Sequence, residues 1–322
     1  MVLDEFGIIQ HYFSRQATQP SVIKGIGDDC AILSVPEQQQ LVLSLDTLVE
    51  GRHFPASAAP YDIATRAMCT AISDLAAMGA TPLWFTLALT LPDVNEAWLE
   101  AFSRGIFDIA DSHTMDLIGG DTTCGPLTIS VQVHGCVDPG QLLTRGAACI
   151  GDHLFVSGNL GDGAAALAAI QGRITPSSEV LKHLHSRFYA PSPQIVLGRQ
   201  LLPFSSAAID ISDGLLADAQ HIADASGVGM RINIDQLPID SALTHYSDDY
   251  YSWALSGGDD YQLLFTVSDD KIESFKRYSI QHALDVSAIG HVVDASHGVS
   301  CYDQGLPYSL PANQRGYQHF TA

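Results

Sequence analysis

Positive charge is scarce in this sequence. Only 15 of its 322 residues are Lys or Arg, against 36 Asp and Glu, so the formal net charge is −21 with His neutral. Basic side chains supply most of the affinity for a nucleic-acid backbone, so this composition argues against a nucleic-acid partner. If the ligand is an anion, something else must carry the positive charge, and a divalent metal ion is the obvious choice.

Paired cysteines and long apolar runs are also absent. The six cysteines lie far apart with no CxxC pair, which argues against a disulfide framework and is typical of a reducing cytosol. Residues 1–13 carry acidic side chains and no cationic segment, so no signal peptide is expected. No apolar run approaches the roughly 20 residues that span a bilayer. We therefore expect a soluble, cytoplasmic protein with no membrane partner.

Several common site motifs are missing as well. The sequence has no GxxxxGK[ST] phosphate loop, no HExxH, no GxSxG and no EF-hand loop. A dinucleotide fingerprint begins at 25–27, but its sixth position is Cys30 instead of Gly. These absences argue against P-loop enzymes, zinc peptidases and serine hydrolases.

The length and the apolar content predict two domains with real cores. Hydrophobic residues make up 46% of the chain, and roughly 150 residues is usual for one domain. Up to residue 137 the apolar patterns predict the order β-α-β-α-β-β. Gly and Pro cluster at 139–152, which predicts a boundary near 148. The second half again alternates helices and strands, as in an α/β or α+β domain, including one expected helix at 240–254.

What the sequence does contain is a series of Asp residues beside Gly or at strand ends. Hard oxygen ligands in such places are what Mg²⁺ binds, with phosphate oxygens and water completing its coordination. Neighbouring Gly residues let the backbone approach a phosphate closely. The stretches are 25–29, 44–46, 73–74, 119–121, 210–214 and 257–260.

Most of these stretches also have a simpler explanation. An acid at a helix start, such as Asp213, gains about 0.3–1 kcal/mol from the helix dipole. The Gly-rich stretches 119–121 and 257–260 are compatible with ordinary turns. Asp74 is harder to explain, because its neighbours on an expected helix are apolar and a buried unpaired carboxylate is costly. Arg66, two turns earlier, is one candidate partner for it, and a metal ion is the better one.

Taken together, nine segments resemble the thiamine-monophosphate kinases. They occur in the order of that family and cover the chain from end to end: GIGDDCA (25–31), SLDTLVEGRHF (44–54), SDLAAMGATP (73–82), LTLPD (89–93), LIGGDTT (117–123), LTRGAA (143–148), DISDGL (210–215), LSGGDDY (255–261) and GYQHF (316–320). The resemblance implies an α/β (α+β) chain with the two-domain fold of aminoimidazole ribonucleotide synthetase. In that fold the N-terminal domains of two subunits pair into a barrel, with ATP near the interface. It thus implies a homodimer in which 1–148 binds ATP and Mg²⁺, while 149–322 completes the nucleotide and substrate site.

The resemblance also implies an activity, the transfer of the γ-phosphoryl group of ATP to thiamine monophosphate to give thiamine diphosphate. The acceptor is a phosphate that is already anionic near neutral pH, so no catalytic base is required. Alignment and several Mg²⁺ ions can carry such an in-line transfer. This agrees with a chain that has many carboxylates and few cations.

Carried over position by position, the resemblance implies three groups of site residues. The implied Mg²⁺ ligands are Asp29, Ser44, Leu45 (through its backbone carbonyl), Asp46, Asp74, Asp121, Asp210 and Asp213. The implied ATP contacts are Gly120, Asp121, Arg145 and Ser212. The implied contacts to thiamine monophosphate are His53, Asp259 and Tyr317, although an ordinary loop role for His53 and C-terminal packing for Tyr317 stay open.

Two positions depart from the family pattern. The family more usually has Glu where this chain has Asp259, which is one methylene shorter, so a substrate contact there is either lost or bridged by water. Position 45 is often Thr in the family and is Leu45 here.

Two other classes of protein remain as alternatives, and the first is another enzyme of the same superfamily. Aminoimidazole ribonucleotide synthetase is possible on fold alone. Selenophosphate synthetase would need a reactive Cys in a Gly-rich N-terminal segment, and the hydrogenase maturation protein would need a Cys at its C-terminus. A non-catalytic acidic metal-binding protein would explain the charge, but neither Asp74 in an apolar helix nor Arg145 in its Gly-flanked loop.

Overall fold

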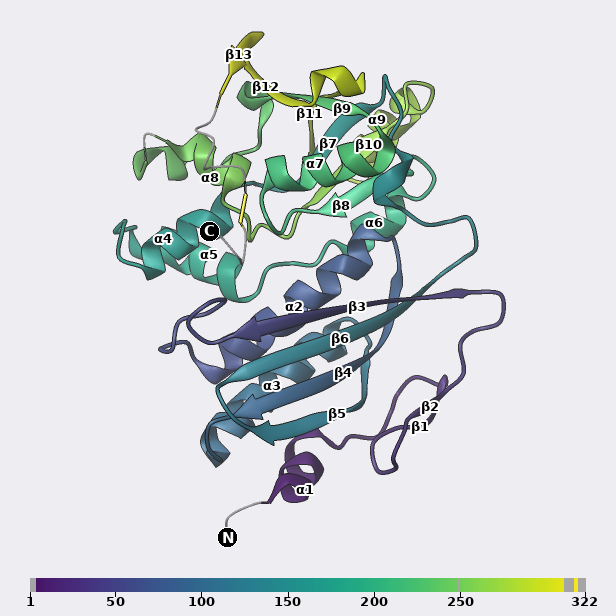
Figure 1. The fold of residues 1–322 in the computed structure, drawn as a ribbon, viewed down its shortest axis with the longest axis vertical. Coiled ribbons are helices and arrows are strands. Elements are labelled where there is room, and N and C mark those ends of the chain that lie inside the picture. The colour runs from purple at the N-terminus through teal and green to yellow at the C-terminus, as the bar shows by residue number, and fades with distance from the viewer. Residues whose placement is uncertain (1–3, 248, 310–315, 318–322) are drawn as a thin grey trace. The chain divides into compact units, whose positions relative to one another are not determined.

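The chain divides into two compact units, each with its own sheet. The structure is a computed structural model that describes residues 4–247, 249–309 and 316–317 (Figure 1). Unit 1 comprises the residues up to Leu75 together with Ala80–Gln141, and unit 2 comprises Ala76–Gly79 and the residues from Leu142 on. Within the described ranges, no helix has the length and apolar character needed to cross a bilayer.

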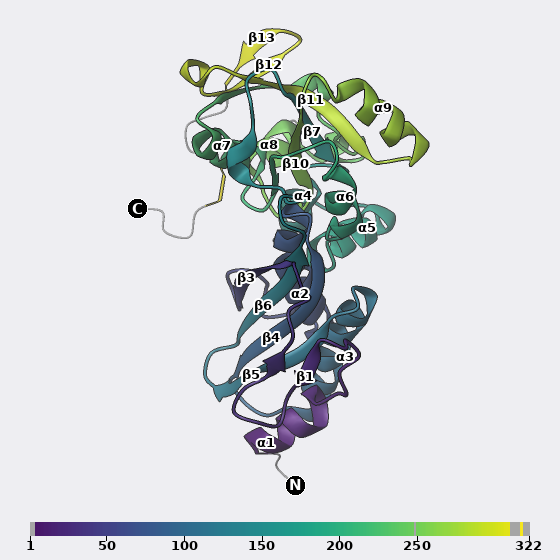
Figure 2. The same cartoon turned by 90° about the vertical axis from the view of Figure 1, so that its right-hand side faces the viewer.

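Unit 1 is a four-stranded sheet with two helices on one face (Figures 1 and 2). The strand order is β3-β6-β4-β5, and β4 and β5 pair in parallel while the other neighbours are antiparallel. The elements are β3 (Gln40–Val49), α2 (Pro60–Ala77), β4 (Thr81–Leu91), α3 (Glu96–Ser112), β5 (Asp116–Cys124) and β6 (Thr128–Val137). This confirms the predicted order β-α-β-α-β-β.

A short N-terminal segment that the sequence did not predict precedes this sheet. It consists of α1 (Glu5–Ile8), the π-helix η1 (Ile9–Phe13) and the hairpin-like pair β1 (Val22–Lys24) and β2 (Ile32–Leu33). These elements have two to five residues each, too few for a periodic pattern to be read.

Burial alternates along β3, so one of its faces is covered and the other is open. Residues of β3 that lie opposite the buried Ile129, Val131 and Val133 of β6 share the face covered by the helices. On the other face, Leu41, Leu43 and Leu45 are 43%, 57% and 58% exposed. A row of exposed leucines therefore follows one side of β3.

Unit 2 is built on a seven-stranded sheet in the order β13-β12-β9-β11-β7-β10-β8. Its strands are β7 (His153–Ser157), β8 (Ala208–Asp210), β9 (Gly229–Asn233), β10 (Leu263–Val267), β11 (Val286–Val293), β12 (Val299–Asp303) and β13 (Leu306–Tyr308). Its helices are α4 (Asp162–Ile170), α5 (Ser178–Tyr189), α6 (Ile195–Leu201), α7 (Leu215–Ser226), α8 (Tyr250–Ser256) and α9 (Ile272–Gln281). Short 3-10 turns are η2 (Arg145–Ala147), η3 (Ile234–Gln236), η4 (Leu243–His245) and η5 (Ala295–His297).

The prediction of a single helix at 240–254 was wrong. The structure has the 3-10 turn η4 and then α8, with a break between them. At the break Ser247 Oγ accepts a hydrogen bond from the backbone N–H of Asp249 at 3.1 Å. Ser and Asp favour such local bonds over helix continuation, which explains why the apolar pattern misled.

Candidate active site

An acidic cluster forms in unit 1 where β3 faces α2. Ser44 and Asp46 lie on the covered face of β3, and Ser44 Oγ donates a hydrogen bond to Asp74 Oδ2 on α2. Burial and, after it, the negative charge of Asp74 raise the pKa of Asp46 to about 6. Three of the residues implied as Mg²⁺ ligands are thus brought together by the pairing of one strand with one helix.

Leu45 lies between Ser44 and Asp46 but points to the open face. Its side chain is 58% exposed, as strand alternation requires. The geometry leaves only its backbone carbonyl as a possible ligand, which is compatible with Leu in place of the family's usual Thr.

His53 follows β3 in a turn that α2 helps to hold. Its ring Nδ1 accepts a hydrogen bond from the backbone N–H of Val49 at 2.9 Å. Arg66 of α2, which is 3% exposed, donates from Nε to the backbone oxygen of His53 at 2.9 Å. Arg66, considered above as a partner for Asp74, thus anchors the turn that carries His53.

Gly120 sits inside β5, where the sheet itself requires a glycine. A Cβ at this position would lie 1.9 Å from the backbone oxygen of Leu87 on the neighbouring strand β4. The stretch 119–121 is therefore part of β5, not a turn, and β5 continues through it to Cys124.

Asp121 and Asp29 are exposed on separate segments of unit 1. Asp121 follows Gly120 on β5, and its Oδ1 accepts from the backbone N–H of Thr122 at 3.0 Å. Asp29 lies in the loop between β1 and β2, beside Asp28, whose pKa is lowered by a hydrogen bond from Lys24. Both carboxylates are open to solvent, and metal or phosphate can approach them without a change in packing.

In unit 2 a buried carboxylate that the sequence analysis missed holds the loop after β8. Asp218 Oδ2 accepts hydrogen bonds from the backbone N–H groups of Ser212, Asp213 and Gly214, each at 3.1 Å. Burial, followed by the charge of Asp213, raises the pKa of Asp218 to about 7, and the three hydrogen bonds oppose this shift. Asp210, at the end of β8, is 4% exposed.

Asp213, Asp218 and His221 form a group that could hold a metal ion. One ligand atom of each lies within 4.8 Å of the others. Asp218 and His221 are three residues apart on α7 and so share a face of the helix. Asp213 was predicted from the sequence, whereas Asp218 and His221 were not, because neither stands beside Gly.

The implied substrate residues Asp259 and Tyr317 both bond to the loop 212–214. The backbone N–H of Asp259 donates to the oxygen of Ser212 at 2.9 Å, and that of Tyr317 to the oxygen of Asp213 at 3.0 Å. The Tyr261 hydroxyl donates to Asp259 Oδ1 at 3.0 Å. Four implied site residues of unit 2 therefore meet at one loop; the last residues of the GYQHF segment, 318–320, lie outside the described residues.

Asp259 adopts a backbone conformation that is unusual for a residue with a side chain. Its φ is 64°, in the left-handed region, directly after Gly258 at φ 67°. At Gly258 a Cβ would lie 2.5 Å from the oxygen of Ser212, so close packing explains the glycine. Asp tolerates this region better than most residues, and the strain points to a constrained position.

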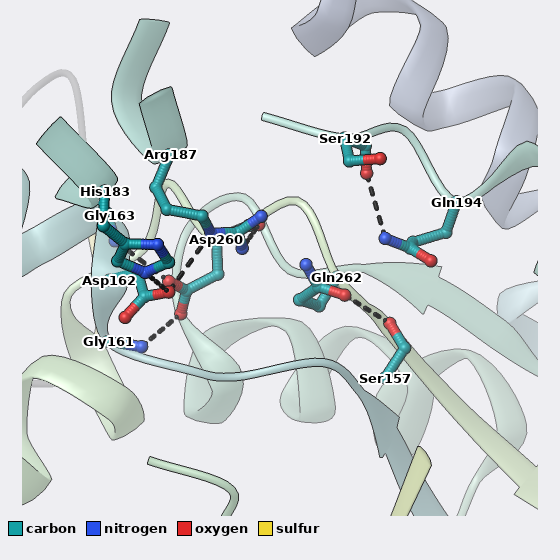
Figure 3. Close-up of polar contacts among 10 residues, drawn as sticks. All are labelled: Ser157, Gly161, Asp162, Gly163, His183, Arg187, Ser192, Gln194, Asp260 and Gln262. Atoms are coloured by element: carbon teal, nitrogen blue, oxygen red, sulfur yellow. Dashed lines mark hydrogen bonds and ion pairs between the residues drawn. The ribbon is translucent and has the colours of Figure 1, made fainter. Parts of the chain in front are cut away.

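A second buried carboxylate, Asp260, fixes the other side of this turn (Figure 3). It is 1% exposed and accepts hydrogen bonds from the backbone N–H groups of Gly161 at 2.9 Å and Gly163 at 3.1 Å. Burial raises the pKa of Asp260 to about 7. The turn that carries Asp259 is thereby tied to the start of α4.

Arg187 of α5 extends this network, as Figure 3 shows. It donates from Nη2 to the backbone oxygen of Asp260 at 3.1 Å and from Nε to Asp162 Oδ2 at 3.2 Å. Asp162 also bonds to His183 Nε2 at 3.0 Å. These side chains border a pocket of about 520 Å³. The residues joined by these hydrogen bonds are 21 to 73 positions apart in the sequence, so no local motif revealed the network.

Arg145, the implied nucleotide contact, is exposed in η2. Its backbone oxygen accepts from Ser226 Oγ at the end of α7 at 2.8 Å. The backbone of Arg145 is thus fixed while its side chain faces solvent, as a residue that binds phosphate oxygens requires.

The donors in both units suit Mg²⁺. Buried or half-buried carboxylates whose pKa values are raised by burial and by a neighbouring carboxylate are destabilised in their charged form. A divalent cation with a preference for oxygen ligands relieves both effects.

Comparisons with known proteins agree with the family resemblance of the sequence over the whole chain. Residues 27–137 match the family described as AIR synthase related protein, N-terminal domain, and residues 150–302 match its C-terminal domain. The thiamine-monophosphate kinase of Salmonella typhimurium is 44% identical over 325 residues, which cover 100% of this chain and 99% of the relative. The chain belongs to the thiamine-monophosphate kinase family.

Solved structures of the family share the fold. The thiamine-monophosphate kinase from Stenotrophomonas maltophilia K279a matches with a TM-score of 0.82 and 42% identity, over 90% of this chain and 93% of that one. A structure described as AaThiL complexed with AMPPCP and TMP matches with a TM-score of 0.77 and 32% identity, over 92% of each chain. The resemblance read from nine segments is thus confirmed, and so is a mixed α/β fold of the AIR synthase type.

Proposed function

We propose that this protein transfers the γ-phosphoryl group of ATP to thiamine monophosphate and so forms thiamine diphosphate. The observation that carries the proposal is full-length membership of the thiamine-monophosphate kinase family at 44% identity. A family structure with AMPPCP, an analogue of ATP, together with TMP supports the same pair of substrates.

The proposed chemistry needs alignment and charge neutralisation more than proton transfer. The phosphate of the acceptor is already anionic, so no side chain has to act as a catalytic base. Mg²⁺, when bound, neutralises charge on the transferred phosphoryl group. The task of the protein is then to hold the metal ligands in place, and the hydrogen bonds of Asp74 with Ser44 and of Asp218 with the backbone of Asp213 support this role.

Within this proposal the Mg²⁺ ions are held by side chains from both units. The Ser44–Asp46–Asp74 cluster, the carbonyl of Leu45, and the exposed Asp29 and Asp121 serve in unit 1. Asp210 and Asp213 serve in unit 2. Gly120, Asp121, Arg145 and Ser212 contact ATP, and His53, Asp259 and Tyr317 contact thiamine monophosphate.

We further propose a homodimer that pairs through the open face of the unit 1 sheet, with 1–148 providing dimerisation and the nucleotide and metal site, and 149–322 completing the site. The supporting observation is the row of exposed leucines on β3. By family analogy the expected interface is the apolar strand 84–91 and its neighbours, and β3 belongs to the same sheet. Trp84, Phe85, Leu87 and Leu89 are buried within unit 1, so the exposed leucines of β3 are the part of this region that a partner can reach.

A cytoplasmic location belongs to the same proposal. All six cysteines are unpaired in the structure, although Cys30, Cys124 and Cys149 are exposed. Unpaired exposed cysteines are typical of a reducing compartment.

One assay tests the function directly. The protein is incubated with ATP, Mg²⁺ and thiamine monophosphate, or in parallel with the substrates of aminoimidazole ribonucleotide synthetase, and the products are identified by ³¹P NMR. We expect thiamine diphosphate and ADP in equal amounts. Turnover of the alternative substrates without thiamine diphosphate, or no turnover of any substrate, would overturn the proposal.

A further inference from the structure

We propose that Asp218 is a positioning residue that orients the nucleotide-binding and substrate-binding sides of the loop 212–214 at the same time. This inference rests on the function proposed above. Its basis is that a single carboxylate oxygen accepts three consecutive backbone N–H groups, each at 3.1 Å, at a site where Asp218 is 2% exposed.

The start of α7 explains why the loop needs this carboxylate. Its N-cap residue is Gly214, which has no side-chain oxygen to accept the nearby N–H groups. A side chain at 214 is excluded, because φ is 116° and a Cβ would lie 2.9 Å from the backbone carbon of Ser256. Asp218, one turn into the helix, reaches back and accepts from the N–H groups of the N-cap residue and of the two residues before it.

The planarity of the peptide group couples the two sides of the loop. The oxygen of Ser212 and the N–H of Asp213 belong to one rigid plane, and they point in opposite directions. The N–H bonds to Asp218, and the oxygen accepts from the N–H of Asp259. If Asp218 is lost, this plane can rotate, and Asp259 loses its alignment.

The next peptide group repeats this arrangement. Its N–H, from Gly214, bonds to Asp218 at 3.1 Å, and its oxygen, from Asp213, accepts from the N–H of Tyr317 at 3.0 Å. Asp218 therefore controls the carbonyl groups that hold two proposed substrate residues, as well as the backbone that presents Ser212 and Asp213 to nucleotide and metal. It acts through these neighbours and needs no contact of its own with either substrate.

The test compares three variants of the full chain. Asp218→Leu removes the acceptor at similar size, and Asp218→Asn keeps one oxygen acceptor without the charge. Asp224→Asn is the matched control, because Asp224 is exposed on the same helix and bonds to Gln220 at 2.7 Å. Hydrogen exchange is measured on the ligand-free proteins, and steady-state kinetics are measured with each substrate varied.

In Asp218→Leu we expect exchange of the amides of 213, 214, 259 and 317 to accelerate by about tenfold or more, and the KM values for both ATP and thiamine monophosphate to rise by about tenfold. Asp218→Asn should fall between the wild type and Asp218→Leu in both exchange and KM, and Asp224→Asn should match the wild type. Unchanged exchange at 213 and 214, or a KM effect confined to ATP, would overturn the proposal.

Two further results keep the test decisive. If Asp218→Leu does not fold, Asp218→Asn still decides, since faster exchange at 259 and 317 supports the coupling and wild-type exchange with raised KM values contradicts it. If the wild type makes no thiamine diphosphate, the proposed function fails, whereas the exchange data still establish whether Asp218 holds the loop.

Discussion

The carboxylates of Asp46 on β3 and Asp74 on α2 interact across the covered face of the unit 1 sheet, and the charge of Asp74 contributes to the raised pKa of Asp46. Two acids in such a position repel each other when no cation is bound. The Ser44 hydroxyl, which donates to Asp74, relieves only part of this repulsion.

We therefore expect Asp74→Asn to lose activity while the protein stays folded. Turnover should fall by roughly 100-fold or more, because the variant lacks a charged metal ligand. The melting temperature of the metal-free protein should be unchanged or higher, since one of two repelling charges is gone. Steady-state assays over a range of Mg²⁺ and a thermal melt in EDTA measure both effects, and an active Asp74→Asn enzyme contradicts the metal assignment.

The raised pKa of Asp46 also sets a pH dependence of stability. The pKa is about 6 in the folded protein and 3.8 as the ordinary value, so between these values the folded chain binds more protons than the unfolded chain. The free energy of unfolding of the metal-free protein should accordingly fall as the pH rises through this range. Asp218, with a pKa of about 7, extends the fall toward neutral pH.

Thermal melts in EDTA at pH values from about 5 to about 8 measure this dependence. Asp46→Asn should show a smaller fall than the wild type, and saturating Mg²⁺ should reduce the fall in the wild type. A melting temperature that rises over this range would contradict the assignment of a raised pKa to these carboxylates.

Asp259 should affect the binding of thiamine monophosphate more than that of ATP. Asp259→Ala is expected to raise the KM for thiamine monophosphate about tenfold, the usual effect of losing a hydrogen bond to a charged group, with little change for ATP. Asp259→Glu should be tolerated. Because φ is 64° at this position, Asn, which tolerates the left-handed region, serves as the backbone control. An unchanged KM for thiamine monophosphate in Asp259→Ala removes this residue from the substrate site.

The leucine row on β3 should determine the oligomeric state. We expect the wild type to sediment at twice the chain mass of 34.5 kDa at micromolar concentration, and Leu43→Glu at the mass of one chain. Leu306→Glu is the matched control, because Leu306 is 72% exposed in unit 2. A wild type that sediments only as a monomer, or a dimer that survives Leu43→Glu, speaks against this interface.

The sequence predicted most helices and strands because their apolar patterns are long. It did not predict strand order, since that depends on pairing between distant residues such as Leu263 and Asp210. The Gly-rich stretch 119–121 was compatible with a turn on the sequence alone, whereas in the structure Gly120 lets β5 approach β4.

Only some residues of the candidate site could be predicted from the sequence, and the reason is physical. Residues that stand beside Gly or at strand ends, such as Asp46 and Asp213, carry a local signal. Asp218 and Asp260 carry none, because their roles consist of hydrogen bonds to backbone groups that only the fold brings near. Supporting carboxylates of this kind are visible only once the loops they hold have been placed.

The alternation along β3 places two tasks on one strand. Ser44 and Asp46 belong to its covered face, and Leu43 and Leu45 to its open face, in an unbroken register with β6 from Gln40 to Val49. A shift of one residue would turn the acids outward and the leucines inward. Insertions or deletions inside β3 should therefore be excluded during evolution, even where single substitutions in either row are accepted, whereas the loop before the strand, at 34–39, is free to change in length.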